Sequence, residues 1–198
     1  MMRRFDPLAA AIALVVTIGA CQVQKESTAP VMAPSMSRGG NDATAITDEK
    51  QLAQLRQVTE KFHKFESAKE AGYSSQITPC WAHHSAGGMG YHYGNLALFD
   101  ATVDLLNPET VMYEPQAGGH MRLVGMEYIV PIVAWEAAKH DVNDPNDVPQ
   151  LLGQKFTKHS FLPIYKLHIW LWEQNPSGTY ADWNPKVSCK NADSTVVF

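Results

Sequence analysis

Four residues that can ligate a metal ion stand in segments otherwise made of apolar or small residues. His92 lies in the glycine-rich run AGGMGYHYGN, and His168 lies in YKLHIWLWE. Glu114 and Glu127 lie in two segments rich in Val, Met, Tyr and Ile. Neutral imidazole is the commonest metal ligand in proteins, and a carboxylate neutralises part of the ion's charge. The four residues therefore predict a cleft that binds a divalent metal ion (Zn, Fe or Mn), with positions left open for water or substrate.

Each of these residues also has a purely structural interpretation. His92 fits a tight glycine-rich loop in which its ring hydrogen-bonds to the backbone. His168 fits a satisfied core residue that stacks against tryptophans. Glutamate is seldom fully buried unless it is paired, so one of the acids could lie in solvent while the other pairs with Arg122 or Lys166.

The chain lacks the short motifs of several common site classes. It contains no GxSxG turn, no phosphate-binding Walker loop, no dinucleotide fingerprint and no CxxC or CxxCH pair. In His92-Tyr93-Gly94, glycine stands where a cupin would carry the second histidine of HxH. The neighbours His83 and His84 are weaker candidates for the site, because adjacent strand residues point to opposite faces.

Two other functions stay open beside the metal site. Thioether and imidazole groups together favour Cu(I), which would give a copper-handling protein, although methionine also fills gaps in cores; the methionines concerned are Met89, Met112, Met121 and Met126. Aromatic residues with polar groups suit a non-catalytic module that binds a small molecule or an envelope partner; they are Tyr165, Trp170, Trp172, Tyr180 and Trp183.

The first residues of the chain have the pattern of an export signal. Two arginines precede a short apolar run, which small residues connect to Cys21. The run is shorter than the roughly 20 residues that a membrane-spanning helix needs. The sequence IGAC at residues 18–21 resembles the bacterial lipobox. This resemblance implies a signal peptide over residues 1–20, a lipidated Cys21 that anchors the chain in a membrane, and, with Gln22 next, an outer-membrane location facing the periplasm.

The rest of the chain divides into a tether and one domain. Residues 21–47 are rich in Ser, Thr, Ala and Pro without apolar periodicity, which is typical of a flexible linker. Residues 48–198 are long enough for a single domain with its own core. The formal net charge of −4 gives no indication of a nucleic-acid partner. Cysteines of exported proteins usually pair, so a disulfide between Cys80 and Cys189 is predicted, with two free thiols as the alternative.

The patterning predicts an α+β fold, in which an amphipathic N-terminal helix packs on a mostly antiparallel sheet or partial barrel. The segments Thr110–Pro115 and Arg122–Pro131 are predicted to form a hairpin in which Pro115 pairs with Arg122 and Glu114 with Leu123, and Tyr165–Glu173 is predicted to form a further strand. Helices are expected over Asp48–Ala71 and Ala97–Leu106, and Gly72, which follows the first of them, is expected to have a positive φ. A helical turn is expected over residues 134–140, and closing strands at Thr179–Trp183 and Val187–Cys189.

Several segments of the domain also resemble a group of uncharacterised exported bacterial proteins. They are GGMGYHYGN, YEP, LVGMEYIVP and HIWLWEQNPSG…DWNPKVSC. The resemblance implies no activity. It implies only that these segments belong to one domain design.

Overall fold

The computed structural model describes the backbone from Gly39 to Phe198 and the side chains from residue 48 onward. The predicted signal peptide, Cys21 and the tether up to residue 38 lie outside the described residues. Within the described part of the chain, no helix is both long and apolar enough to cross a membrane. The helices are α1 (Gly39–Thr59), η1 (Glu60–His63), α2 (Phe65–Glu70), η2 (Leu96–Leu98), η3 (Ala117–Gly119) and α3 (Ile132–Ala137).

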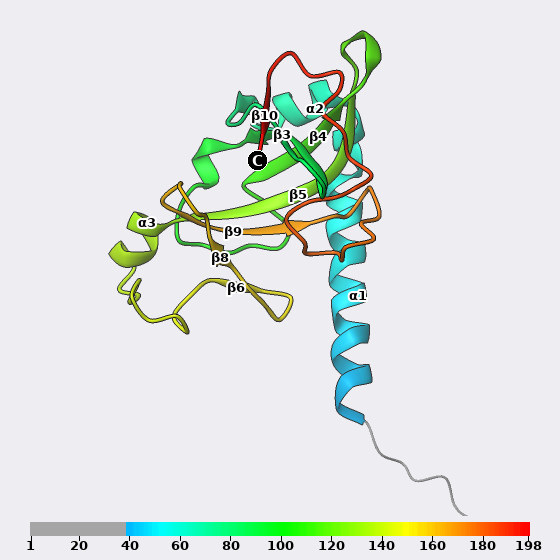
Figure 1. Ribbon diagram of the computed structural model, residues 1–198. Coiled ribbons are helices and arrows are strands. Elements are labelled where there is room, and N and C mark those ends of the chain that lie inside the picture. The colour runs from blue at the N-terminus through cyan, green and yellow to red at the C-terminus, as the bar shows by residue number, and fades with distance from the viewer. Residues whose placement is uncertain (1–38) are drawn as a thin grey trace, which may run out of the picture. The chain divides into compact units, whose positions relative to one another are not determined.

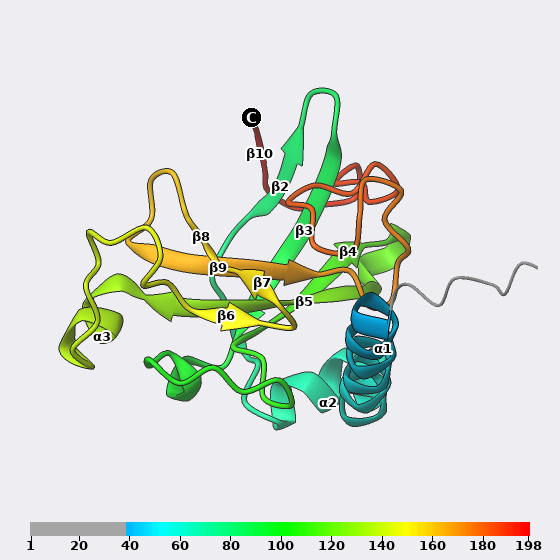
Figure 2. The same ribbon diagram turned by 90° about the horizontal axis from the view of Figure 1, so that it is seen from below.

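A curled, mostly antiparallel sheet of eight strands forms the centre of the domain (Figure 1). Its order is β10-β2-β3-β4-β5-β9-β8, with β1 also paired to β3, and only β10 and β2 run parallel. Figure 2 shows α1 and α2 at one end of β5 and α3 at the other. The strands are β1 (Ser75–Gln76), β2 (Cys80–His83), β3 (Gly87–Gly94), β4 (Thr110–Pro115), β5 (Met121–Pro131), β8 (Thr157–Lys158), β9 (Ile164–Ile169) and β10 (Thr195–Val197), and β6 (Gln150–Leu151) and β7 (Gln154–Lys155) form a separate hairpin.

One face of the sheet carries the main apolar core. Tyr113, Tyr128 and Tyr165 are fully buried there, together with Leu55 of α1. The Tyr113 hydroxyl donates a 2.6 Å hydrogen bond to the Phe62 carbonyl oxygen, which ties the centre of the sheet to η1. The α+β class is therefore confirmed, with helical residues and the sheet sharing one core.

The N-terminal helical region is less regular than the sequence predicts. Helix α1 begins at Gly39 rather than Asp48, and the predicted helix over Asp48–Ala71 is divided into α1, η1 and α2. Lys64 has an extended backbone between η1 and α2. The predicted positive φ at Gly72 is confirmed, at 103°.

The predicted helix over Ala97–Leu106 is wrong. Only η2 forms there, and an irregular chain follows it. The Asp100 and Asp104 carboxylates accept the backbone N–H groups of Thr102 and Leu106. Aspartate that bonds nearby backbone in this way competes with helix formation.

The predicted hairpin is confirmed, with strands β4 and β5 at nearly the expected residues. Its register differs by one position, because Pro115 pairs with Met121 and Glu114 pairs with Arg122. A bulge between Met112 and Tyr113 shifts the pairing by one residue. Met112 therefore pairs with Gly125, and the rest of the hairpin has the predicted register.

The glycine-rich run around His92 forms β3, a strand in the middle of the sheet order. Its glycines admit neighbouring backbone: a Cβ at Gly90 would overlap the Tyr113 carbonyl oxygen, and one at Gly87 would overlap the backbone of Asn184. Both glycines also have positive φ. Close approach of other chain segments therefore explains the composition.

The C-terminal part of the chain differs most from the prediction. Strand β9 ends at Ile169, and residues 179–183 and 187–189 form no strand. Strand β10 instead adds to the sheet edge beside β2. The predicted disulfide is confirmed, since Cys80 and Cys189 are bonded across 109 residues of sequence.

Candidate metal centre

Three of the four predicted ligands meet in one buried group on the sheet face opposite the main core. One ligand atom from each of His92, Glu127 and His168 lies within 4.8 Å of the others. The Glu127 carboxylate is 3.6 Å from His92 Nε2 and 3.3 Å from His168 Nε2. Within the described residues, no other group of three or more His, Cys, Asp or Glu side chains is arranged in this way.

The register of neighbouring strands brings these residues together. Glu127 on β5 lies directly opposite His168 on β9, and Thr110 on β4 lies opposite Glu127 on its other side. His92 on β3 pairs with Met112, two residues along β4 from Thr110. Because paired residues and residues two apart share a face, the three side chains must project to the same side.

The spacing of the ligand atoms suits a first-row metal ion. Bonds of about 2.0–2.2 Å in a tetrahedral site place ligand atoms roughly 3.4 Å apart. His92 Nε2 lies 3.6 Å from Glu127 Oε2 and His168 Nε2 lies 3.3 Å from Glu127 Oε1, so each imidazole is near this distance from one of the two carboxylate oxygens. A set of two imidazoles and one carboxylate also leaves coordination positions open, as catalytic rather than structural metal sites do.

Each imidazole has a second polar group beside its Nδ1 atom. His92 Nδ1 is 2.9 Å from Thr78 Oγ1, and His168 Nδ1 is 3.4 Å from Asp182 Oδ1. Lys166 donates to the same Asp182 carboxylate. Metal-bound histidines usually form a hydrogen bond through their other ring nitrogen, as His92 does with Thr78, and this turns the remaining nitrogen toward the ion. In both rings the nitrogen that faces Glu127 is Nε2.

His168 makes no hydrogen bond although its ring is fully buried. Neither of its nitrogens has a hydrogen-bond partner of adequate geometry in the described part of the chain. A buried polar group without a partner costs roughly 1–3 kcal/mol, so such a group calls for an explanation. A metal ion at Nε2 would supply the missing partner.

Burial also keeps His92 in the protonation state that a metal ion requires. Desolvation lowers the pKa of His92 to about 4, more strongly than the Glu127 carboxylate raises it. The ring is therefore neutral at neutral pH, with a lone pair available for a metal.

Glu114, the fourth predicted ligand, lies elsewhere on the same face. Its carboxylate accepts hydrogen bonds from Arg122, from Gln116 and from the backbone N–H of Ser188. The Arg122 guanidinium also pairs with Glu173. The structural interpretation of this acid as an ion-pair partner therefore applies to Glu114, and the site contains one glutamate.

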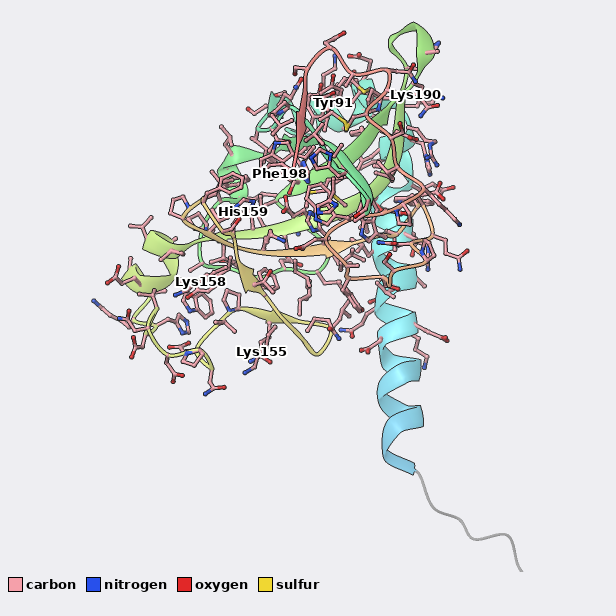
Figure 3. All side chains as sticks on the ribbon, viewed as in Figure 1. Tyr91, Lys155, Lys158, His159, Lys190 and Phe198 are labelled. Carbon is pink, nitrogen blue, oxygen red and sulfur yellow. A yellow bond between two sulfur atoms is a disulfide. The ribbon has the colours of Figure 1, made fainter. Side chains whose placement is uncertain are left out.

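Two cavities lie beside the group, and Trp81 and His159 line both of them. The first, which we call the small cavity, has a volume of about 180 Å³ and largely apolar walls, and His92 and Glu127 contribute to its lining. Its other lining residues are Ile77, Thr78, Phe99, Ile129, Leu162, Pro163 and Ile164. The second, which we call the large cavity, has a volume of about 370 Å³, and Lys166 and Asp182 contribute to its lining. Its other lining residues are His83, Met89, Thr157, Lys158, Ser160, Phe161, Trp183 and Phe198. Figure 3 labels His159, which follows β8.

The residues of the two alternative functions are dispersed. Met112 and Met126 lie in the core and Met89 lines the large cavity, while no methionine lines the small cavity. Of the five aromatic residues named for a binding module, Trp183 lines the large cavity, beside Phe161 and Phe198, whereas Trp170 and Trp172 line a separate cavity. His83 also lies there, with its Nδ1 occupied by the backbone N–H groups of Ser85 and Ala86.

Sequence reasoning did not identify three further polar residues at the site. Thr78 and Asp182 lie in connecting segments, and His159 begins the loop between β8 and β9. Their own segments carry no periodic pattern that would mark them. Only the folded arrangement places them beside the predicted ligands.

Comparisons with known proteins add no information on this site. No family model matches the chain, and neither a curated protein nor a solved structure matches it. Functional inference therefore rests on the geometry of the residues.

Proposed function

We propose that this protein binds one divalent transition-metal ion (Zn, Fe or Mn) through His92, Glu127 and His168. The ion would present its open positions to the small cavity, where a small molecule would bind. The observation that carries the proposal is the convergence of both Nε2 atoms on the Glu127 carboxylate, with each Nδ1 beside an outer partner.

The residues around the ion would have different roles in binding and orientation. A bound metal supplies Lewis-acid activation of an oxygen ligand or of water. Thr78 would hold the His92 ring in the ligating orientation through its hydrogen-bond contact with Nδ1. The Asp182 carboxylate lies 3.4 Å from Nδ1 of His168 and would compensate positive charge on that ring. The apolar residues of the small cavity limit the water around the ion, which strengthens its interaction with a bound ligand.

Metal affinity of the chelator-stripped protein tests this proposal. We expect one Zn²⁺ per chain in a competition titration against a chromophoric chelator. His92→Asn and His168→Asn should each weaken Zn²⁺ binding at least hundredfold, because a three-ligand site loses one ligand. His83→Asn is the matched control and should bind as the unchanged protein does.

Two results would contradict the proposal. One is a folded, unchanged protein that binds no metal ion, which would favour the aromatic-lined binding module. The other is unchanged affinity in both site variants. Copper handling would instead be favoured by Cu(I) binding that Met89→Leu abolishes and Glu127→Gln does not.

We further propose that the chain is an outer-membrane lipoprotein that faces the periplasm. The lipobox-like IGAC sequence supports the anchor, and the Cys80–Cys189 disulfide is typical of an oxidising compartment. Labelling of cells with a radioactive fatty acid should mark the protein, and Cys21→Ala should remove the label. An unlabelled protein that fractionates with the cytosol would contradict this location.

A further inference from the structure

We infer that the small cavity receives a small carboxylic acid with an apolar body, whose carboxylate binds the metal ion and accepts a hydrogen bond from His159. This inference rests on the proposed metal site and names the class of ligand for it. Three observations carry it: the charge of the site, the walls of the small cavity and the hydrogen bonds of His159.

The charge of the loaded site favours an anion. A divalent ion with one glutamate and two neutral imidazoles leaves one net positive charge in a buried place. The nearby Lys166 and Asp182 compensate each other through their ion pair and leave this charge unchanged. Because an uncompensated buried charge is costly, a monoanionic ligand would complete the site.

The walls of the small cavity limit the size and the polarity of the ligand beyond its carboxylate. At about 180 Å³, the cavity holds only a few heavy atoms beyond a carboxylate. Ile129, Leu162 and Ile164 are among the residues that line it, and they offer no polar group in their side chains. A short aliphatic body would fit this surface, whereas a sugar or a nucleotide would leave polar groups without partners.

The hydrogen bonds of His159 fix which ring nitrogen carries its proton. Nδ1 accepts the backbone N–H groups of Phe161 and Leu162, at 3.4 and 3.2 Å. The neutral ring must therefore carry its proton on Nε2, which gives it one N–H donor. Since His159 lines the same cavity as His92 and Glu127, we expect this donor to reach a ligand on the metal ion.

His83 provides a matched comparison within the same protein. Its Nδ1 likewise accepts two backbone N–H groups, from Ser85 and Ala86, both at 3.2 Å. His83 lines the large cavity but not the small one. A general effect of removing a histidine would appear at both positions, whereas a contact with the ligand would appear at His159 alone.

The test uses the full chain loaded with Co²⁺, whose visible absorption responds to its ligands. We expect isobutyrate to bind at least tenfold more tightly than isobutyramide, which has the same shape and no charge. His159→Phe should weaken isobutyrate binding about tenfold with its Co²⁺ content unchanged. His159→Gln, which keeps an N–H donor, should bind more tightly than His159→Phe, and His83→Phe should bind as the unchanged protein does.

The outcomes separate this inference from the metal site on which it rests. Equal affinity for the acid and the amide, or the absence of isobutyrate binding to the Co²⁺ protein, would overturn the inference alone. The same holds if His159→Phe leaves isobutyrate binding within twofold of the unchanged protein. Failure of the unchanged protein to bind Co²⁺ would overturn the metal site and the inference together.

Discussion

Glu114 and Glu127 project from the same face of one hairpin, and their surroundings differ in one decisive way. Glu114 meets the guanidinium of Arg122 and the N–H of Ser188. Glu127 meets two imidazole rings, of which His92 is held neutral by burial. The first acid therefore has its cation within the chain, whereas the second has ligands arranged around a place where a cation would fit.

A third buried acid, Glu109, avoids the cost of a buried negative charge in another way. Burial raises the pKa of Glu109 to about 8, while the N–H of Ile129, donated to its carboxylate, opposes this rise. Glu109 therefore carries a proton at neutral pH. The three glutamates are stabilised by an arginine, by a proton and, in our account, by a metal ion. Glu109 directly precedes β4, and the residue types in and beside β4 and β5 do not by themselves distinguish the three acids.

Removing the disulfide should change the free energy of unfolding more than any other substitution considered, and it should act on the surroundings of Glu114. Cys189 follows Ser188, whose N–H reaches Glu114, so the bond to Cys80 holds this segment in place. Replacing both cysteines with alanine should lower the free energy of unfolding by about 4–5 kcal/mol, because the bond closes a long loop. Urea denaturation measures this loss. The Zn²⁺ affinity of the folded variant should stay within threefold of that of the unchanged protein. A larger loss of Zn²⁺ affinity in the folded variant would show that the surroundings of Glu114 and the metal site are not independent.

The proton on Glu109 predicts a pH dependence of stability. The unfolded carboxyl ionises near pH 4.5 and the folded one near pH 8. The unfolded chain therefore releases this proton first, and the contribution of Glu109 to stability falls as the pH rises from 4.5 to 8. Glu109→Gln should remove this dependence and raise stability at pH 8 by about 4 kcal/mol. Glu66→Gln, at an exposed helical position, should keep the original dependence; an identical pH profile for both variants would contradict the assignment.

Exchanging the two hairpin acids for glutamine tests the comparison directly. Glu114→Gln should lower the free energy of unfolding by about 2 kcal/mol, since Arg122 loses a carboxylate partner, and should leave Zn²⁺ affinity unchanged. Glu127→Gln should weaken Zn²⁺ binding at least hundredfold and should change the stability of the metal-free protein much less. Chelator competition and urea denaturation of both variants measure the two effects. The reverse pattern would show that the roles of the two acids are exchanged.

Thr78 should give the smallest effect, because it acts through His92. Thr78→Val removes the oxygen beside Nδ1 with little change of shape, and should weaken Zn²⁺ binding about tenfold. Thr78→Ser keeps the oxygen and should restore the affinity. Equal affinities of the valine and serine variants would show that Thr78 does not orient the ring.

The predictions from sequence succeeded where a residue stood out from its own segment. The β-forming residues on both sides of Gly118 and Gly119 predict the hairpin, and Glu127 within it predicts one member of the buried group. His92 and His168 are predicted for the same reason. Glu114 was grouped with them because strand alternation gives the face of a side chain but not its partner. Its partners at Ser188 and Glu173 come from distant segments that the pattern does not connect.

The failures have a common physical origin in tertiary contacts. The glycine-rich strand β3 has low intrinsic strand propensity, and it forms because neighbouring backbone needs the space that its missing Cβ atoms leave. Strand β10 depends on pairing with β2, more than a hundred residues earlier in the chain. Thr78, Asp182 and His159 gain their roles only from their neighbours in the folded domain.

Anomalous diffraction from crystals grown with Zn²⁺ tests the central claim most directly. We predict one strong peak at the zinc edge, about 2.0–2.2 Å from the Nε2 atoms of His92 and His168 and from a Glu127 carboxylate oxygen. The peak should disappear in Glu127→Gln crystals and persist in Glu114→Gln crystals. A well-ordered structure without density between the three residues, or with zinc bound only at another place, would contradict the account.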